Sequence, residues 1–264
     1  MIPGITANDA HKSSSSSYQA NAVTFGGTTT LVNSSLTSTD NNFVSFAGWF
    51  RPTSSDLSFS VPFVVDPTAN GGNYFHVRTN FAIQGTPEQL NFIAAETSGS
   101  IQVGYNTGGN PTLIAGAWCH VIGSVEGTGA PPHFFQLYVN NAQVIDLFTT
   151  DTNTDVIPLA NGLPFWVGND GQSDPYFGSM ADFSFWPGIS FLESGGDIPL
   201  ETRRLFIDAS GAPVNPSTAI AALGHPAVML SGNASTFRLN TLGGSGSFTV
   251  TTGGLTNDLT PVHL

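Results

Sequence analysis

The stretch that decides the fold is Tyr176-Phe177-Gly178-Ser179-Met180-Ala181-Asp182-Phe183-Ser184-Phe185-Trp186. The bulky residues Phe183 and Phe185 alternate with smaller ones, and Phe177 lies in phase upstream. This period of two predicts a strand with one buried face. Gly178 stands where a large side chain is expected, which indicates a bulge or a close approach of another backbone.

The same β-rich, aromatic pattern recurs at short spacing along the chain. Turn residues such as Asn140-Asn141 separate the segments, since Asn and Gly adopt positive φ at low cost. One short helix is expected at 199–208, where Pro199 and Glu201 suit a first turn. Many strands without alternating helices predict an all-β, antiparallel β-sandwich of the jelly-roll kind, with Trp and Phe side chains buried between its sheets. The further strands are expected at 23–25, 28–32, 43–51, 59–65, 74–83, 89–94, 101–105, 118–125, 134–145, 165–167, 228–230 and 248–250.

Composition excludes several classes of function. Charged residues make up 9% of the chain and the net charge is −12, with one lysine and five arginines. Nucleic acid is therefore excluded as a partner, because phosphate binding needs clustered basic residues. The adjacent pair Arg203-Arg204 is expected to lie on an exposed helix face. No apolar run is long enough to cross a membrane. The single cysteine, Cys119, excludes an internal disulfide and a thiolate-rich metal site, and we expect a buried thiol.

The chain divides into an N-terminal arm, residues 1–20, and a single domain, residues 21–264. The arm carries the serine run Ser13, Ser14, Ser15, Ser16 and Ser17 and has too little apolar surface to fold alone. The rest of the chain suits one large β domain. The first residues lack a basic region followed by an apolar core, so we expect synthesis and assembly in a cytoplasm, or export by a route that the sequence does not show.

Four segments occur in a recognisable order between residues 20 and 190. They are Phe43 to Arg51, Ala117 to Val121, Leu137 to Asn141, and Phe165 to Gly168 followed by Tyr176 to Asp182. In this order they resemble the laminin-G-like, concanavalin A-like jelly roll shared by lectins and pentraxins. The stretch from Pro199 to about Thr252 resembles the C-terminal part of laminin-G-like proteins encoded by tailed bacteriophages.

The second resemblance implies a virion component, such as a capsid decoration, head-fibre or tail-associated protein. It implies a homo-oligomer or capsid-bound chain with other virion proteins as partners, and we expect residues 13–17 to make assembly contacts. Exposed rim loops would contact host-surface glycans. Fold resemblance alone does not establish a function.

The candidate binding site is the loop at 169–174. Its oxygen-rich side chains suit Ca²⁺, which takes six to eight oxygen ligands. Asp170 and Asp174 are the candidate ligand-binding residues, with Tyr176 as a ring that could stack on a sugar. A metal site needs a second loop, for which Asp66 is the best partner to Asp170. The alternative is that both aspartates are turn residues, because each precedes Gly or Pro.

No array of paired acids suits a glycosidase, which needs two carboxylates flanking one bond. Glu193, Asp197 and Glu201 are evenly spaced but interrupted by Gly195-Gly196. Asp182 follows Gly178 as an acidic residue does in the laminin-G-like family, so the resemblance implies that it braces its strand through backbone hydrogen bonds. We therefore expect no catalytic residues and a non-enzymatic virion protein. A soluble, Ca²⁺-dependent carbohydrate-binding module and a divergent glycanase are the alternatives.

Overall fold

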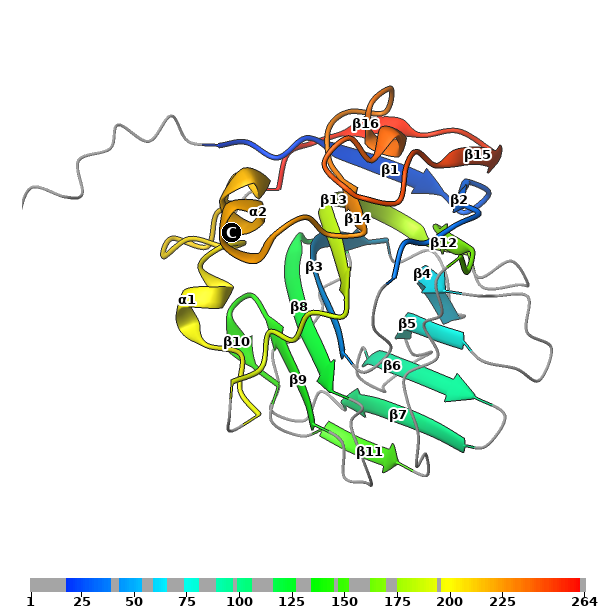
Figure 1. The fold of residues 1–264 in the computed structure, drawn as a ribbon. Helices are drawn as coiled ribbons and strands as arrows, with labels where there is room; N and C mark the ends of the chain where they lie inside the picture. The colour runs from blue at the N-terminus through cyan, green and yellow to red at the C-terminus, as the bar shows by residue number, and fades with distance from the viewer. Residues whose placement is uncertain are drawn as a thin grey trace, which may run out of the picture.

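The structure is a computed structural model that describes residues 18–38, 43–53, 59–65, 74–80, 89–96, 99–105, 116–126, 134–144, 147–151, 162–169, 175–193 and 196–261. In this part of the chain two antiparallel sheets of eight strands each pack face to face (Figure 1). Sheet A contains β1 (Ala22–Gly26), β3 (Phe43–Pro52), β8 (Cys119–Glu126), β9 (Phe134–Val139), β10 (Ala142–Gln143), β13 (Phe177–Pro187), β14 (Val228–Leu230) and β16 (Thr256–Asp258). Sheet B contains β2 (Thr30–Asn33), β4 (Phe59–Val65), β5 (Tyr74–Asn80), β6 (Gln89–Glu96), β7 (Gly99–Tyr105), β11 (Leu147–Asp151), β12 (Phe165–Val167) and β15 (Thr249–Thr252). The antiparallel β-sandwich predicted from the sequence is confirmed.

Strand β13, which carries the deciding stretch, lies in the middle of sheet A. The order of that sheet is β10-β9-β8-β3-β13-β1-β16, with β14 also paired to β13, and the order of sheet B is β11-β7-β6-β5-β4-β12-β2-β15. The register of β13 on β3 shifts between Ala181 and Ser184, so the bulge lies near Asp182. Gly178 is instead a close approach: a Cβ there would lie 2.6 Å from the carbonyl oxygen of Arg51.

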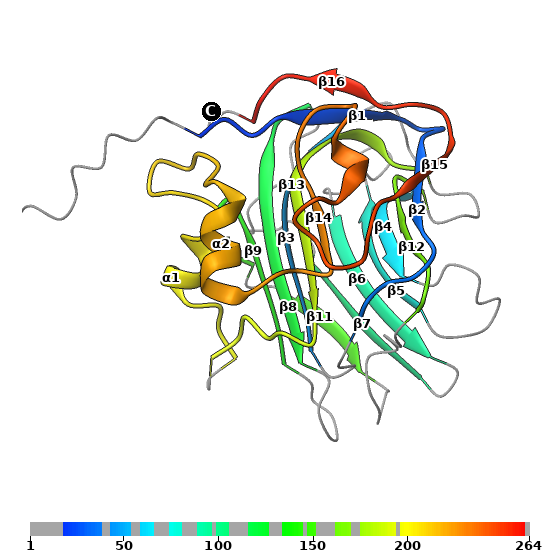
Figure 2. The ribbon, with the colours of Figure 1, turned by 45° about the horizontal axis from the view of Figure 1, so that its top comes forward.

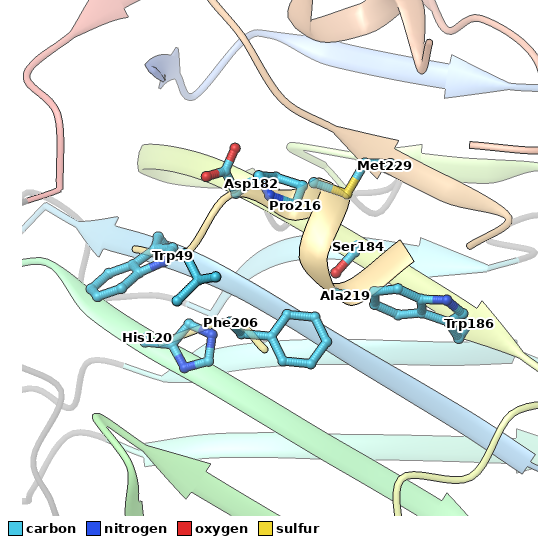
Figure 3. A pocket seen from close by; sticks show the side chains of 10 residues that line it. Trp49, His120, Asp182, Ser184, Trp186, Phe206, Pro216, Ala219 and Met229 are labelled. Carbon is cyan, nitrogen blue, oxygen red and sulfur yellow. The ribbon is translucent and has the colours of Figure 1, made fainter. Parts of the chain in front are cut away.

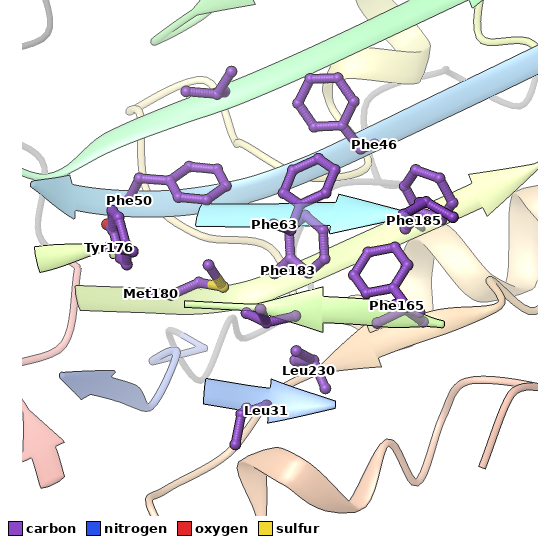
Figure 4. Close-up of a cluster of buried hydrophobic side chains, with 14 of the residues drawn as sticks. Leu31, Phe46, Phe50, Phe63, Phe165, Tyr176, Met180, Phe183, Phe185 and Leu230 are labelled. Carbon is purple, nitrogen blue, oxygen red and sulfur yellow. The ribbon is translucent and has the colours of Figure 1, made fainter. Parts of the chain in front are cut away.

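Phenylalanines from both sheets fill the space between them and form the central core (Figure 4). Phe183 and Phe185 of β13 face this space, as predicted, and meet Phe63 of β4 and Phe165 of β12. The ring centroids of Phe63 and Phe183 lie 4.7 Å apart, and those of Phe165 and Phe185 lie 5.0 Å apart. All four rings are fully buried. Burial of each contributes roughly 1.5–3 kcal/mol, so this cluster fixes how the sheets face each other.

The tryptophans of β3 and β13 correct the sequence analysis, which placed them between the sheets. Trp186 lies on the outer face of sheet A, where its ring centroid is 5.3 Å from that of Phe191 and 5.6 Å from that of Phe206. Trp49 lines a cavity on the same face. The segment that follows β13 covers this face with two short helices (Figure 2). Strand β13 is therefore buried on both sides, with Phe on one and Trp on the other.

The two helices are α1 (Leu200–Arg203) and α2 (Pro216–Leu223). The first is the helix predicted for 199–208, but it ends after four residues, and Ile207 then pairs with Pro213 in an isolated bridge. The second was not predicted, although its signals are in the sequence. The Asn215 side chain accepts a hydrogen bond from the backbone N–H of Ser217 at 3.0 Å, Pro216 opens the helix, and Gly224 ends it with φ of +88°. A single 3₁₀ turn, η1 (Phe237–Leu239), follows in the same region.

Arg203 is half-buried, which corrects the expectation of an exposed arginine pair. Its guanidinium lies 4.0 Å above the ring of Tyr138, measured from Cζ to the centroid. It also donates hydrogen bonds to the backbone oxygen of Asn141 at 2.9 Å and to the carbonyl oxygen of Ile198 at 3.1 Å. These contacts attach α1 to the turn between β9 and β10, so the cation has a structural role.

The two ends of the described chain belong to the same sandwich. Strand β1 lies between β13 and β16, while β15 pairs with β2, so the C-terminal segment adds one strand to each sheet (Figure 1). Tyr18 and Ala20, which were expected in the N-terminal arm, already pack against sheet A, and Ala20 is fully buried. Residues 1–17 lie outside the described residues. Among the described residues, no helix is long and apolar enough to span a bilayer.

Candidate functional site

Most residues of the predicted site lie outside the described part of the chain. Asp66, Asp170, Asp174 and the serines at 13–17 are all in undescribed segments. Tyr176 is described, and it is fully buried: its hydroxyl donates a hydrogen bond to the carbonyl oxygen of Ser179 at 2.9 Å. Its ring packs edge-on against Phe25, with centroids 5.8 Å apart. Tyr176 therefore belongs to the core, and no face of its ring is available to a sugar.

The described residues instead bring titratable side chains together in a pocket that sequence reasoning missed. This outer pocket lies between the outer face of sheet A and the segment carrying α1 and α2 (Figure 3). Its free volume is about 10 Å³, which corresponds to one water molecule. A pocket of this size has no room for a substrate, so its polar groups act on the fold itself. It is lined by Trp49, His120, Asp182, Ser184, Trp186, Phe206, Val214, Pro216, Ala219 and Met229.

His120 is one of the two titratable groups among the described residues that line the outer pocket. Strand β8 places its ring between Trp49, at a centroid distance of 5.2 Å, and Phe206, at 6.3 Å. Its side chain is 1% exposed, and Nδ1 has no hydrogen-bond partner among the described residues. Burial lowers the pKa of His120 to about 3, because the charged imidazolium would lose its hydration. His120 is therefore neutral in the folded protein at physiological pH.

Asp182 is the second titratable group. It lies at the β13 bulge with φ of +44°, and its carboxylate is almost completely buried. The hydroxyl of Tyr18 lies 3.1 and 3.0 Å from the two carboxylate oxygens, and the hydroxyl of Ser231 donates to Oδ1 at 2.7 Å. The predicted bracing role through backbone groups is thus replaced by bonds to side-chain hydroxyls. Three segments far apart in sequence meet at this one carboxylate.

Burial shifts the pKa of Asp182 upward, whereas it shifts the pKa of His120 downward. Burial raises the pKa of Asp182 to about 6, although the hydrogen bonds from Ser231 and Tyr18 act in the opposite direction. In the unfolded chain the ordinary pKa is 3.8. The folded state is therefore favoured below the unfolded pKa, and this contribution is lost as the pH rises through about 6.

Replacing Asp182 by asparagine should reduce the loss of stability between pH 4 and pH 7. Asparagine tolerates the positive φ, keeps an acceptor for Tyr18 and carries no charge. The pKa difference corresponds to roughly 3 kcal/mol of unfolding free energy. Urea unfolding of both proteins at several pH values measures it, since other titrating groups cancel in the difference. The control is Asp208→Asn: because hydrogen bonds lower the pKa of Asp208, its effect should have the opposite sign. Parallel pH curves for Asp182→Asn and the wild type would contradict the prediction.

Every aspartate whose side chain is described accepts bonds from its own chain. Asp197 accepts a hydrogen bond from the hydroxyl of Tyr138 at 2.5 Å, and Asp258 forms an ion pair with Arg51. Asp208 accepts bonds from the backbone N–H groups of a tight turn at 210–212. In the described segments, no three His, Cys, Asp or Glu residues gather in a way that could hold a metal ion. These carboxylates stabilise the fold and are not arranged as an acid pair.

Comparison with known proteins identifies the fold. Residues 25–189 match a laminin G-type family, the concanavalin A-like lectin/glucanases superfamily. A heptameric SAP-like pentraxin from Limulus polyphemus is 14% identical and superposes with a TM-score of 0.52, covering 91% of this chain and 95% of that one. A putative carbohydrate binding protein from Bacteroides ovatus is also 14% identical, with a TM-score of 0.50 and coverage of 91% and 60%.

A third similar structure is tailspike protein 2 of Escherichia coli O157:H7 bacteriophage CAB120, which is 15% identical with a TM-score of 0.44, covering 64% of this chain and 22% of that one. Comparison with curated proteins gives no match. At 14% identity the pentraxin and the putative carbohydrate binding protein show a shared fold alone. The family match, however, spans more than half of the chain, from β1 to β13. This protein therefore belongs to the concanavalin A-like lectin/glucanases superfamily.

Proposed function

We propose that this chain is a non-catalytic structural protein of a bacteriophage particle, which contacts host-surface glycans through loops at the rim of its sandwich. It would be attached through its N-terminal arm and neighbouring subunits, as a capsid decoration, head-fibre or tail-associated protein. The observation that supports a non-catalytic role is that the described aspartates are already bound within the fold. Each already binds hydroxyl, guanidinium or backbone N–H groups of its own chain. A glycosidase needs two carboxylates that face one bond across an accessible cleft.

The anchoring of Tyr18 supports attachment through the arm. Its hydroxyl is held by Asp182, and its ring packs with the cluster that contains Trp49 and Ile207. A load on residues 1–17 would therefore reach the sandwich through a fixed point. The sequence from 199 to 252, which resembles laminin-G-like proteins of tailed bacteriophages, supports the particle assignment. A chain with 9% charged residues also suits contacts between subunits, since few charges need to be desolvated.

A particle-binding experiment tests the proposal. Full-length protein and a variant that begins at Tyr18 would be mixed with particles that lack this chain, and the bound fraction measured by sedimentation. We expect the full chain to bind and the shortened one to remain in solution with unchanged circular dichroism and melting temperature. The deletion ends at residue 17 because Tyr18 and Ala20 are packed. Equal binding of both proteins would remove the arm from the proposal, and release of products from host polysaccharide would remove the non-catalytic assignment.

A Ca²⁺-dependent carbohydrate-binding module is the second candidate, favoured by the oxygen-rich sequence at 169–174. Glycan-array binding that is abolished by a chelator and by Asp170→Ala would support it. Asp208→Asn is a suitable control, because Asp208 caps a turn elsewhere. A flat array without any response to calcium would exclude it.

A further inference from the structure

The chain enters the sandwich through a short stretch that lies outside any strand. Residues 18–21, which we call the arm root, directly precede β1. Side-chain contacts attach the arm root to sheet A: Ala20 is fully buried, and the ring of Tyr18 packs against the cluster that contains Trp49. Strand β1, in contrast, is held by a neighbouring strand on each side. The arm root can therefore leave sheet A without breaking the pairing of β1.

The Tyr18 hydroxyl ends at a partner that is fixed in the sheet. Asp182 lies in β13, which pairs with β1, β3 and β14, and Ser231 directly follows β14. The hydroxyl of Ser231 donates to Oδ1 of Asp182 at 2.7 Å, and the hydroxyl of Tyr18 lies 3.1 and 3.0 Å from the two carboxylate oxygens. Because strands hold Asp182 and Ser231, Tyr18 is the side of this contact that can move.

The Asp182 carboxylate lies just beneath the protein surface. Asp182 is 7% exposed, whereas the two residues that bond to its carboxylate, Tyr18 and Ser231, are only partly buried. Figure 3 shows the carboxylate directed away from the ring of His120, which lines the same outer pocket. Movement of Tyr18 would therefore admit water to the carboxylate and leave both sheets intact.

Ionisation of Asp182 has two opposing effects on the closed contact. It strengthens the hydrogen bonds that the carboxylate accepts from Tyr18 and Ser231, and it creates a charge that is shielded from water. The second effect is larger, since burial raises the pKa of Asp182 from 3.8 to about 6 despite both hydrogen bonds. Burial and the Asp182 charge also raise the pKa of Tyr18, so its hydroxyl stays a neutral donor.

The described charges on the elements around Asp182 are bound to other groups. His120 of β8 lines the same pocket but is neutral above about pH 3. Arg51 of β3 forms an ion pair with Asp258 of β16, and Arg204, next to α1, donates to backbone carbonyl oxygens. Strands β1 and β14 and helix α2 carry no charged residue. The buried charge of Asp182 is therefore stabilised by hydroxyl groups alone among the described residues.

We propose that Tyr18, Asp182 and Ser231 form a pH-sensitive latch, which holds the arm root on sheet A in acid and loosens as Asp182 ionises. When the latch is open, the carboxylate is hydrated and its pKa returns towards 3.8. The preference for the closed form is therefore complete below pH 3.8 and is lost as the pH rises through about 6. Between pH 4 and pH 7 the ratio of open to closed molecules should rise about fiftyfold.

This latch would change where the N-terminal arm is attached. In the closed form a force on residues 1–17 acts on Tyr18, and in the open form it acts on the start of β1. The inference concerns the chain itself and does not depend on its assignment to a particle. A bound fraction measured with particles and an opening ratio measured on the free chain can therefore fail separately.

Thiol labelling of the full-length variant Ala20→Cys tests the latch. Ala20 is fully buried, so a thiol at this position reacts only when the arm root opens, whereas the buried Cys119 reacts only when the sandwich unfolds. A disulfide reagent that works from pH 4 to pH 7 is used, and each rate is divided by the rate of the urea-unfolded protein at the same pH. We expect this ratio at position 20 to rise about fiftyfold from pH 4 to pH 7 and to exceed that of Cys119 throughout. Equal ratios at both positions, or no change with pH, would overturn the latch.

Hydrogen–deuterium exchange of the unsubstituted protein provides the second measurement, in case the cysteine disturbs packing. The peptide that covers residues 19–25 should lose protection between pH 4 and pH 7, after correction for the intrinsic effect of pH on exchange. Protection of β8, which reports unfolding of sheet A, should stay higher at each pH. Protection that falls in parallel in both segments would overturn the latch, because only global unfolding would then respond to pH.

Two variants identify the groups in the latch. Asp182→Asn tolerates the φ of +44° and cannot ionise, so opening should become independent of pH. Tyr18→Phe keeps the ring and removes one hydrogen bond to the ionised carboxylate, so opening at pH 7 should rise about tenfold and opening at pH 4 should rise less. A pH dependence that persists in Asp182→Asn, or unchanged opening in Tyr18→Phe, would each overturn the assignment.

Two controls exclude other titrating groups. His11 belongs to the N-terminal arm, and histidines titrate near pH 6.5, within the range of the experiment. His11→Gln should retain the full pH dependence of opening, and loss of that dependence would assign the effect to the arm and overturn the latch. Asp208→Asn is the matched carboxylate control, because Asp208 binds a turn at 210–212. It should also leave the fiftyfold change in place, and a flat profile in this variant would contradict the role of Asp182.

Discussion

Replacing His120 by phenylalanine should make the folded protein markedly more resistant to acid. In the wild type, burial holds the pKa of His120 at about 3, whereas the ordinary value is 6.5. Below pH 6.5 His120 is protonated in the unfolded chain, whereas in the folded protein it stays neutral down to about pH 3. The stability contributed by the neutral ring is therefore present above pH 6.5 and is lost as the pH falls through this window.

The expected size of the effect is about 1.4 kcal/mol per pH unit, or about 3 kcal/mol between pH 6.5 and pH 4. Phenylalanine keeps the ring contacts with Trp49 and Phe206 and removes Nδ1, the buried nitrogen without a partner. At neutral pH the variant should thus be at least as stable as the wild type.

Urea unfolding between pH 4 and pH 7 measures this difference directly. His120→Gln is the control: it removes the titration but keeps buried polar atoms, so it should flatten the pH dependence as His120→Phe does and be less stable than His120→Phe at every pH. Because His120 and Asp182 line the same pocket, the effects of His120→Phe and Asp182→Asn on the unfolding free energy could be coupled. The double variant that carries both changes should therefore also be measured. If His120→Phe lost stability with falling pH as steeply as the wild type, the buried neutral histidine would be excluded.

Replacing Gly178 by alanine should destabilise the sandwich by about 3 kcal/mol or more. The added Cβ would lie 2.6 Å from the carbonyl oxygen of Arg51, 2.8 Å from the hydroxyl oxygen of Tyr176 and 2.9 Å from the Cα of Pro52. Gly178 is paired with Pro52 in the register of β13 on β3, so the neighbouring backbone cannot move without breaking that pairing. The φ of +155° adds strain for any residue with a side chain.

Thermal and urea unfolding measure this loss. Gly26→Ala is a matched control, because Gly26 also lies in a strand of sheet A, in the register position beside Phe177, and a Cβ there would meet nothing within 4 Å. Its unfolding free energy should change by less than about 0.5–1 kcal/mol. Similar losses in the two variants would mean that strand propensity, and not the close approach, determines the effect.

The strands could be predicted because the alternation of large and small residues, which is visible over a few positions, indicates them. Phe183 and Phe185 alternate in the sequence, and the structure buries both rings between the sheets. The other face of the same strand was not predictable in this way. Trp186 is buried too, but by Phe191 and Phe206 from a segment that follows β13. Alternation tells which residues share a face, and it does not tell what covers the second face.

The outer pocket was harder to predict for the same reason. Asp182 contacts Tyr18 and Ser231, which are 164 and 49 residues away in the sequence. No local sequence pattern predicts contacts between residues so far apart in the chain. The signal that could have found α2 was local: Asn215 and Gly224 flank an eight-residue segment that begins with Pro216. The Asp170 and Asp174 predictions fall outside the described residues and stay predictions.

The position of β1 also determines how the molecule would bear tension. Hydrogen bonds to antiparallel neighbours run perpendicular to a strand, and β1 has such neighbours on both sides, β13 and β16. A pull on Tyr18 along the direction of β1 would load these bonds together, in shear, instead of peeling them open one after another. The N-terminal junction therefore has the geometry of a mechanical clamp.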